Sequence, residues 1–180
     1  MRHIFIINPH AGKKKSTRLL EQNIKALDVF PETIFTKQAG DARRIARTAA
    51  ESGGEVRLYA CGGDGTLNEV VNGAAGFPNA AVTNVPMGTG NDFLKIFGKD
   101  ARERFLDLPA LAAGPQAAMD LIDCNGHLGI DIVCTGVDAR IAAGKDRYNA
   151  LPLVGGIGSY ILSLVENVLF KGISVPTAVD

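Results

Sequence analysis

The chain of 180 residues has no excess of charge of either sign, because nineteen lysines and arginines balance nineteen aspartates and glutamates. A balanced charge gives no indication of a nucleic-acid-binding surface or of strong attraction to an anionic membrane, although local patches are still open. We therefore expect no nucleic-acid partner. Apolar residues make up 46% of the chain and charged residues 21%, which is typical of a globular protein with a buried core.

Cysteine and histidine are scarce. The three cysteines, Cys61, Cys124 and Cys134, lie at wide and irregular spacing, so neither a metal site nor a disulfide framework is predicted. We expect reduced thiols in a cytoplasmic protein, with Cys61 and Cys134 as small apolar residues of strands. The three histidines are scattered, so no Ser-His-Asp or Cys-His site is predicted, and we expect His3 on a strand surface.

Long hydrophobic runs are also scarce. The longest, from residue 151 to 170, contains Glu166, Asn167 and three glycines, so a buried or partly interfacial helix is favoured over a membrane span. Docking of this helix on a membrane surface is the alternative to a core position. The apolar residues 3–7 meet Asn8-Pro9 before they reach signal-peptide length, and they predict a first strand.

Strand-length apolar runs alternate with segments of helical period along most of the chain. The predicted strands are residues 3–7, 33–36, 55–60 and 80–85, and the predicted helices are 16–27, 41–52, 66–73 and 92–97. In the first helix, Leu19, Leu20, Ile24 and Leu27 are expected on one face, and Asp41 is expected to cap the second helix. The alternation predicts an α/β fold, a Rossmann-like parallel sheet with helices on both faces.

The pattern changes after about residue 111. Residues 117–123 and 128–134 are predicted strands, and Asn125-Gly126 between them is a strong hairpin signal. We therefore predict an α/β domain over residues 1–114, followed by the beginning of a β-rich second domain over 115–180. An unfinished strand near 172–180 would leave a sheet edge that favours homo-oligomers.

Ligands of parallel α/β sheets bind beyond the carboxyl ends of the strands, where three turns of this chain are expected to meet. The turn after the third strand, Gly62-Gly63-Asp64-Gly65-Thr66, allows a ligand to approach the backbone closely. Its amides and the N-terminus of the following helix offer a site for phosphate oxygens. Asp64 would repel a phosphate unless a cation lay between them, which implies Mg²⁺. A structural turn with an incidental aspartate is the alternative.

The other two turns have related features. Residues 8–13, NPHAGK, precede a helix but are not a Walker A motif, and Lys13, Lys14 and Lys15 form either a phosphate- or headgroup-binding patch or a solvated loop. The third turn is residues 86–92, PMGTGND. Its glycines allow close approach, Thr89 supplies a hydroxyl, and Asn91 and Asp92 can orient polar atoms or cap the next helix.

These segments, NPHAG at 8–12, GGDGTLNEVVNG at 62–73 and PMGTGNDF at 86–93, resemble the ordered signatures of the diacylglycerol kinase catalytic domain family. The family includes soluble bacterial lipid kinases, sphingosine kinases and ceramide kinases. The Gly-Gly-Asp-Gly core also occurs in NAD kinases, but its extension to Gly73 and the third turn favour the lipid kinases. Thr36 with residues 40–42, and residues 136–139, are similar to further segments of the family.

The resemblance implies a kinase that binds ATP and Mg²⁺ between an α/β domain and a β-rich lipid-binding domain, and phosphorylates a lipid hydroxyl, most simply of a diacylglycerol-type acceptor, at a membrane surface. It implies that Asp64 serves the Mg²⁺–phosphate arrangement, with Asn91 and Asp92 in the same cleft. The implied nucleotide-binding residues are Asn8, Pro9, His10, Ala11, Gly12, Thr36, Gly62, Gly63, Asp64, Gly65, Thr66, Leu67, Asn68, Gly88, Thr89, Asn91 and Asp92.

The chain departs from the family pattern in two respects. Asp131 stands where the family usually has asparagine, and the Asp-Gly-Glu segment that would supply the general base and a structural Mg²⁺ site is absent. A nucleotide-binding module without turnover is therefore one alternative to a lipid kinase. NAD kinase activity is the other.

Overall fold

The computed structural model describes residues 1–149 apart from 13, 89 and 135, together with residues 157–170. Residues 1–131 and 132–180 form two compact units, and each is described by itself. The predicted domain division after residue 114 stays a prediction.

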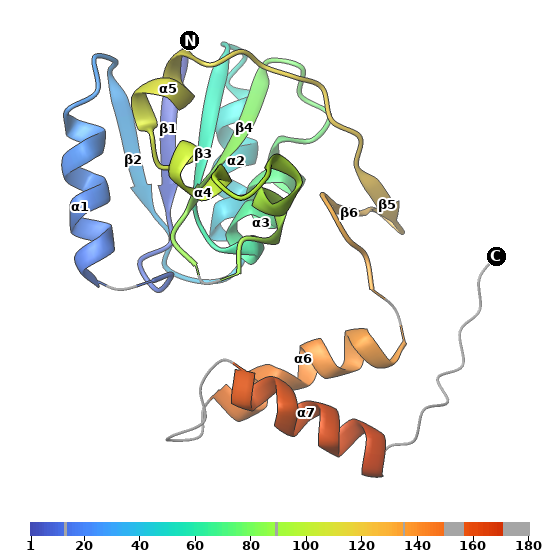
Figure 1. The fold of residues 1–180 in the computed structure, drawn as a ribbon. Helices are drawn as coiled ribbons and strands as arrows, with labels where there is room; N and C mark the ends of the chain where they lie inside the picture. The colour runs from blue at the N-terminus through green and yellow to red at the C-terminus, as the bar shows by residue number, and fades with distance from the viewer. Residues whose placement is uncertain (13, 89, 135, 150–156, 171–180) are drawn as a thin grey trace. The chain divides into compact units, whose positions relative to one another are not determined.

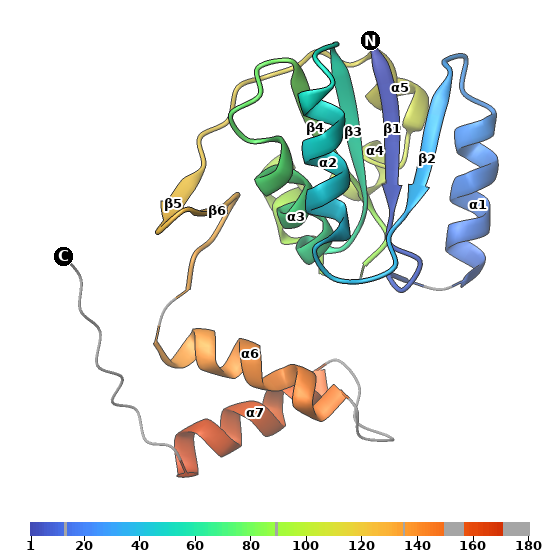
Figure 2. The same cartoon turned by 180° about the vertical axis from the view of Figure 1, so that it is seen from behind.

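The first unit is built on a parallel sheet of four strands in the order β2-β1-β3-β4 (Figure 1). The strands are β1 (Arg2–Ile7), β2 (Pro31–Phe35), β3 (Val56–Gly62) and β4 (Ala80–Pro86). Helices α2 (Asp41–Glu51) and α3 (Asp64–Ala74) cover one face, and α1 (Lys14–Lys25) and α5 (Leu108–Ala113) lie on the other (Figure 2). The predicted α/β sheet with helices on both faces is confirmed.

The central strands follow from their apolar residues. All seven residues of β3 are buried, as expected for a strand that is covered on both faces. Alternate residues face opposite sides: Ile4 and Ile6 pack with α2 and α3, whereas Phe5 and Ile7 pack with α1. Full burial of such a side chain contributes roughly 1.5–3 kcal/mol, so these strands hold the turns at their ends on a rigid frame.

Helix α3 extends to Ala74, beyond its predicted end at residues 72–73, and packs closely on α2. Gly73 permits this packing, because a Cβ atom there would lie less than 3 Å from Arg43 O and 2.8 Å from Ala46 Cβ. In α2, Ile45, Ala46 and Ala49 are buried as predicted. The glycine that the sequence suggests as a helix end is therefore a packing residue.

In α1, the predicted apolar face is only partly buried: Leu19 is 56% exposed, whereas Leu20 and Ile24 are buried. A helix that lies on the edge strand offers only a narrow buried stripe, which Leu20 and Ile24 already fill.

Cys61 is buried in β3 as predicted. Cys134 is exposed and belongs to no strand, so its predicted strand position is wrong.

The segment after β4 differs most from prediction. Residues 92–97 form a 3₁₀ helix, η1 (Asp92–Phe97), and α4 (Ala101–Arg104) and α5 were not predicted. The two predicted strands near residue 125 are much shorter, β5 (Ile122–Cys124) and β6 (His127–Gly129), although the turn at Asn125-Gly126 has the expected positive φ values, 51° and 80°. A lone two-stranded hairpin has little stability of its own, so long strands are not favoured here.

Asparagines on α3 hold this hairpin. Asn72 Nδ2 donates to Leu128 O (2.8 Å), and Leu128 N–H donates back to Asn72 Oδ1 (3.0 Å). Asn68 Nδ2 donates to the same carbonyl (2.9 Å). Asn72 thus replaces the backbone partner that a neighbouring strand would supply to β6.

His3 is buried, so its predicted surface position is wrong. Its Nδ1 lies 2.7 Å from the Tyr59 hydroxyl, and the Arg57 guanidinium on β3 donates to backbone carbonyls at the C-terminal end of α5 and just beyond it. The sequence did not predict α5, which covers the N-terminal end of β1. Without α5, this end of the strand was expected to be exposed.

The buried His3 predicts a pH dependence of stability. Burial, and then the charge of Arg57, lower the pKa of His3 from its ordinary value of 6.5. The unfolded chain therefore binds more protons than the folded one below that pH. We expect the free energy of unfolding to have its full value above about pH 6.5 and to fall as the pH decreases through the pKa of folded His3.

Denaturant titrations at a series of pH values measure this dependence. His3→Gln keeps a hydrogen-bonding group near the Tyr59 hydroxyl but does not titrate, so it should reduce the slope of stability against pH. His127→Gln, at an exposed histidine of the hairpin, is the control for the loss of a histidine elsewhere in the chain. A wild-type slope in His3→Gln would show that another group causes the acid sensitivity.

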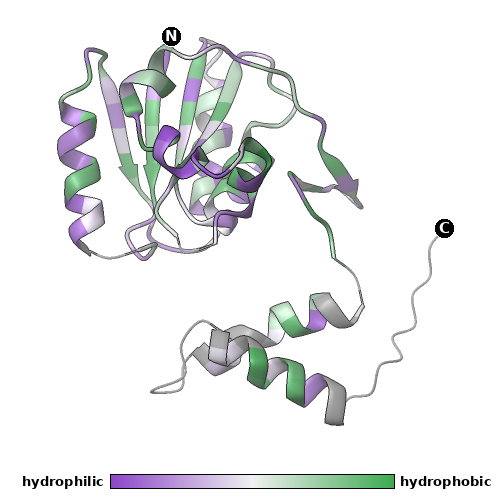
Figure 3. Cartoon of the chain, viewed as in Figure 1, coloured by the Kyte–Doolittle hydropathy of each residue, from purple (hydrophilic) through white to green (hydrophobic). Residues whose placement is uncertain are grey.

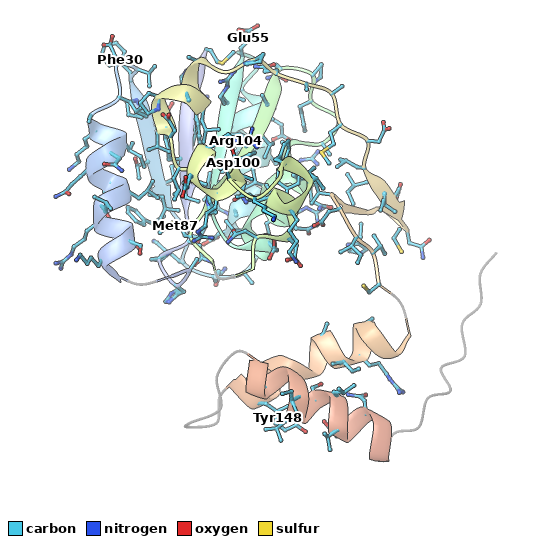
Figure 4. All side chains as sticks on the ribbon, in the orientation of Figure 1. Phe30, Glu55, Met87, Asp100, Arg104 and Tyr148 are labelled. Atoms are coloured by element: carbon cyan, nitrogen blue, oxygen red, sulfur yellow. The ribbon has the colours of Figure 1, made fainter. Side chains whose placement is uncertain are left out.

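In the second unit, α6 (Val137–Asn149) and α7 (Ile157–Phe170) pack against each other. Ser163 Oγ donates to Ile141 O (2.8 Å), and Tyr148, labelled in Figure 4, donates to Glu166 Oε2 (2.7 Å). Figure 3 shows apolar positions along α7, in agreement with the helix predicted over 151–170. No described helix is both long and apolar enough to cross a membrane. Residues 151–156 and 172–180 lie outside the described residues.

Candidate functional site

The three turns meet at the carboxyl edge of the sheet, where strand hydrogen bonding continues into them. Asn8 N–H donates to Cys61 O (3.0 Å), and Thr36 N–H donates to Ile7 O (2.9 Å). The amides of Met87 and Gly88 both donate to Gly62 O, at 2.9 and 3.2 Å. Met87 is labelled at this edge in Figure 4. The first residues after β1, β2 and β4 are therefore fixed by the neighbouring strand.

Glycines let the turns touch through their backbones. Gly12 has φ +76°, and a Cβ there would lie 2.5 Å from Met87 O. A Cβ on Gly88 would lie 2.8 Å from Gly63 Cα. Side chains at these two positions would push the first and third turns away from their neighbours, so both glycines are needed for the arrangement of the turns.

Gly62 and Gly65 differ in what surrounds them. A Cβ on Gly62 would lie less than 3 Å from Thr66 Oγ1, so this glycine is required by the protein itself. A Cβ on Gly65 would meet no described atom within 4 Å, and Gly65 has no positive φ that would favour glycine. The space above Gly65 is therefore open, and no described protein contact explains why this residue has no side chain.

The Asp64 carboxylate joins the second turn to the third. Its Oδ2 accepts a hydrogen bond from Asn91 N–H (2.9 Å), and its Oδ1 accepts one from Asp92 N–H (2.6 Å). A Cβ on Gly90 would lie 2.7 Å from Oδ2, so Gly90 makes room for this carboxylate. Asp64 thus caps η1, a role that the sequence assigned to Asn91 or Asp92, neither of which makes a side-chain cap here.

Asn91 and Lys95 complete the third turn. Asn91 has φ 58° and donates from Nδ2 to Gly88 O (2.7 Å), which closes the turn on itself. Lys95 Nζ lies 2.6 Å from Asp92 Oδ1, and this hydrogen bond and charge raise the pKa of Lys95. Lys95 was not predicted as a site residue, although its spacing of three residues from Asp92 on one helix was an available signal.

A cavity of about 270 Å³ opens beside the first two turns. It is lined by Asn8, His10, Thr36, Lys37, Gln38, Ala39, Ala42, Gly65, Thr66 and Glu69. Asn8 Nδ2 donates to Thr66 Oγ1 (3.2 Å), which fixes both side chains at its wall. A larger cavity, of about 600 Å³, runs along α2 and β2 but contains none of the glycines of the turns.

Not all predicted site residues line the smaller cavity. Asn8, His10, Thr36, Gly65 and Thr66 do so. Leu67 is buried in the core, and the Asn68 side chain bonds to Leu128 O. Thr89 and Lys13 lie outside the described residues, as does the side chain of Lys14. Lys37, Gln38 and Glu69 line the cavity but were not predicted to do so.

The described residues include no group of three or more His, Cys, Asp and Glu side chains that could hold a metal ion by themselves. Asp64 still suits a partial site, because each of its oxygens accepts one backbone hydrogen bond and keeps a further lone pair. Mg²⁺ usually binds through one or two carboxylates, water and the phosphates of a substrate, so the single carboxylate of Asp64 fits the protein's share of such a ligand set.

A family model described as "Diacylglycerol kinase catalytic domain" matches residues 2–124. The chain is 33% identical over 135 residues to a diacylglycerol kinase of Bacillus subtilis, covering 73% of this chain and 44% of the relative. It is 35% identical over 157 residues to a diacylglycerol kinase of Staphylococcus epidermidis, covering 84% and 42%. The chain thus spans less than half the length of these relatives.

The fold is also similar to a solved structure, that of a diacylglycerol kinase from Bacillus anthracis. The TM-score is 0.57 at 24% sequence identity, and the match covers 71% of this chain and 45% of that one. At this identity the likeness concerns the fold alone.

Proposed function

Since this chain belongs to the diacylglycerol kinase catalytic domain family, we propose that it is the nucleotide-binding half of a lipid kinase and binds ATP with Mg²⁺ at the carboxyl edge of its sheet. Such an enzyme transfers the γ-phosphate of ATP to a lipid hydroxyl. The names of the two relatives support a diacylglycerol-type acceptor. We further propose a cytoplasmic protein that meets this acceptor at a membrane surface.

The observation that carries this proposal is the open space at Gly65, beside the first amides of α3. The first hydrogen bond of the α3 ladder runs from Leu67 N–H to Gly63 O (3.1 Å). The amides of residues 64–66 come before this bond, so they have no acceptor within the helix. Such amides, together with the helix dipole, bind phosphate oxygens. The absence of a side chain at Gly65 lets a phosphate reach them.

Asp64 is the residue that would hold Mg²⁺ together with the nucleotide phosphates. The amides of Asn91 and Asp92 fix its carboxylate, so its position depends on backbone rather than on mobile side chains. When bound, the cation neutralises charge on the phosphates during phosphoryl transfer. Lys95, paired with Asp92, adds a positive charge at the same edge.

The residues of this chain bind and orient the phosphate donor. Phosphoryl transfer also needs an acceptor hydroxyl in line with the γ-phosphate and a base to accept its proton. We assign that base to no residue of this chain. A module that binds nucleotide without turnover is therefore the second candidate function, and NAD kinase activity, which shares the Gly-Gly-Asp-Gly turn, is the third.

Phosphate transfer from γ-labelled ATP with Mg²⁺ to lipids in mixed micelles tests the proposal. Labelled diacylglycerol is the result expected of an enzyme that contains this half together with its second domain. Binding of ATP–Mg²⁺ without any labelled lipid would select the non-catalytic module for this chain. Label on NAD but on no lipid would select the NAD kinase.

Asp64→Asn tests the role of the carboxylate in metal binding. Asparagine keeps the size of the side chain but loses its charge and presents an amide donor to one of the two backbone amides. Because hydrogen bonds to charged groups contribute about 1.5–3 kcal/mol, affinity for ATP–Mg²⁺ should fall roughly tenfold or more. Isothermal titration with ATP, once in Mg²⁺ and once in EDTA, measures the affinity for ATP with and without the metal.

The loss in Asp64→Asn should be much smaller for ATP without Mg²⁺. Asp28→Asn, at an exposed aspartate far from the turns in sequence, is the control and should bind as the wild type does. An equal loss with and without Mg²⁺ would mean that Asp64 only shapes the third turn.

A further inference from the structure

Arg102, on α4, is an exposed cation at the third turn. Its Nη1 lies 3.4 Å from Gly88 O, and its Nη2 lies 3.4 Å from both Pro86 O and Gly88 O. Hydrogen bonds from N–H to oxygen usually measure about 2.7–3.2 Å, so these contacts are weak. The guanidinium therefore keeps N–H donors for a stronger acceptor.

Packing holds α4 beside the third turn. Ala101 is buried in the core. The ring of Phe105, just after α4, lies with its centroid 6.3 Å from that of Phe93 and 5.1 Å from that of Phe97, which both belong to η1. The backbone at Arg102 is therefore fixed, while its long side chain can reach a ligand at the turn.

Other cations of this region are held by carboxylates. Lys95 is paired with Asp92 (2.6 Å), and Arg104 Nε lies 3.3 Å from Asp100 Oδ2, two residues that Figure 4 labels on and beside α4. Within the described part of the chain, Arg102 forms no ion pair. Its charge is therefore not neutralised by a neighbouring carboxylate.

Arg44, on α2, is also held by a carboxylate. It donates to Asp41 Oδ1 (3.0 Å), while Asp41 Oδ2 accepts hydrogen bonds from the amides of Lys37 (2.8 Å) and Gln38 (3.2 Å). Asp41 therefore does not cap α2 as predicted. Glu69 does so instead, because its carboxylate accepts hydrogen bonds from the amides of residues 40 and 42.

The third turn lies next to the proposed phosphate site, on the side away from the smaller cavity. A Cβ on Gly88 would lie 2.8 Å from Gly63 Cα, so the carbonyl that Arg102 contacts belongs to a residue packed against the start of α3. The strand order β1-β3-β4 places the second turn between the first and the third, and no residue of the third turn lines the cavity. A nucleotide that enters this cavity and places its phosphates at Gly65 therefore extends its last phosphate toward the third turn.

We propose that Arg102 binds the terminal phosphate of the nucleotide, and so selects a nucleoside triphosphate over a diphosphate. This inference rests on the proposed function, because it assigns one end of the same nucleotide site. A guanidinium can form two parallel hydrogen bonds with phosphate oxygens, which are stronger than bonds to neutral carbonyls. Arg102 then exchanges its weak contacts with the third turn for contacts with the phosphate, and is a specificity-determining residue.

Titration of the full chain with the Mg²⁺ complexes of ATP and ADP tests the inference. Wild type should bind ATP roughly tenfold or more tightly than ADP, because ADP lacks the phosphate that receives hydrogen bonds from the charged guanidinium. In Arg102→Gln, the affinity for ATP should fall to within a few-fold of that for ADP, which itself should change little. An equal loss for both nucleotides would show that Arg102 only supports the third turn, and would overturn the inference.

Arg104→Gln is the matched control. It removes the same charge from the same helix, but Arg104 is paired with Asp100 and donates to Phe97 O, so the preference for ATP should stay as in the wild type. Loss of the preference in Arg104→Gln as well would mean that the net charge of α4, and not a contact of Arg102, attracts the phosphate. Wild type that binds ATP and ADP equally would overturn the role of Arg102 and leave the proposed function standing, whereas wild type that binds neither would overturn both.

Discussion

Alanine in place of Gly65 should remove most of the affinity for nucleotide and leave the fold intact. The new Cβ meets no described protein atom within 4 Å, and the backbone at this position suits any residue. Alanine is also a better helix former than glycine by up to about 1 kcal/mol, so the melting temperature should stay the same or rise. The methyl group would instead stand where the proposed phosphate approaches.

We expect the affinity of Gly65→Ala for ATP–Mg²⁺ to fall by roughly 10- to 100-fold, on the scale of the 1–3 kcal/mol that overpacking of a close contact costs. Isothermal titration and thermal unfolding of the same preparation measure the two effects. Gly54→Ala is the matched control, because this glycine also has open space and no positive φ but lies away from the turns. Wild-type affinity in Gly65→Ala would mean that no ligand approaches this residue.

Alanine in place of Gly73 should have the opposite effect, a large loss of stability. Its Cβ would lie less than 3 Å from the backbone oxygen of Arg43 and 2.8 Å from Ala46 Cβ, and a backbone atom cannot move aside alone. Helices α2 and α3 would have to separate. We expect the free energy of unfolding to fall by about 3 kcal/mol, at the upper end of the range for overpacked cores.

A loss of that size lowers the melting temperature by roughly 10 °C for a chain of this length. Urea titration and calorimetry measure it, and Gly65→Ala serves as the internal control, since it makes the same change eight positions earlier in the same helix. A Gly73→Ala protein with wild-type stability would show that α2 and α3 do not pack as closely as the structure has them.

The sheet, its flanking helices and the convergence of the turns were predictable because they depend on local periodicity and on the rules of parallel sheets. The link between Asp64 and the amides of Asn91 and Asp92 was not, because it joins residues 27 and 28 positions apart through a turn geometry that no local pattern encodes. Gly73 looked like a helix end for the same reason, since its partner belongs to another helix.

The polar residues of α3 illustrate a related difficulty. In sequence, Asn68, Glu69 and Asn72 form part of one motif that resembles a nucleotide-binding signature. In the structure they face different partners: Asn68 and Asn72 bond to Leu128, and Glu69 bonds to the start of α2. The motif therefore identifies the helix but not the contact that each side chain makes. The nucleotide role predicted for Asn68 stays a prediction.

The contacts of α3 have a consequence for how this region opens in solution. One helix ties the 36–42 segment through Glu69, the third turn through Asp64 and the β5–β6 hairpin through Asn72. Segments linked in this way tend to exchange their amide hydrogens as one cooperative unit, or foldon. Protection of these amides should therefore rise and fall together, and nucleotide bound at the N-terminus of α3 should slow exchange even in the distant hairpin.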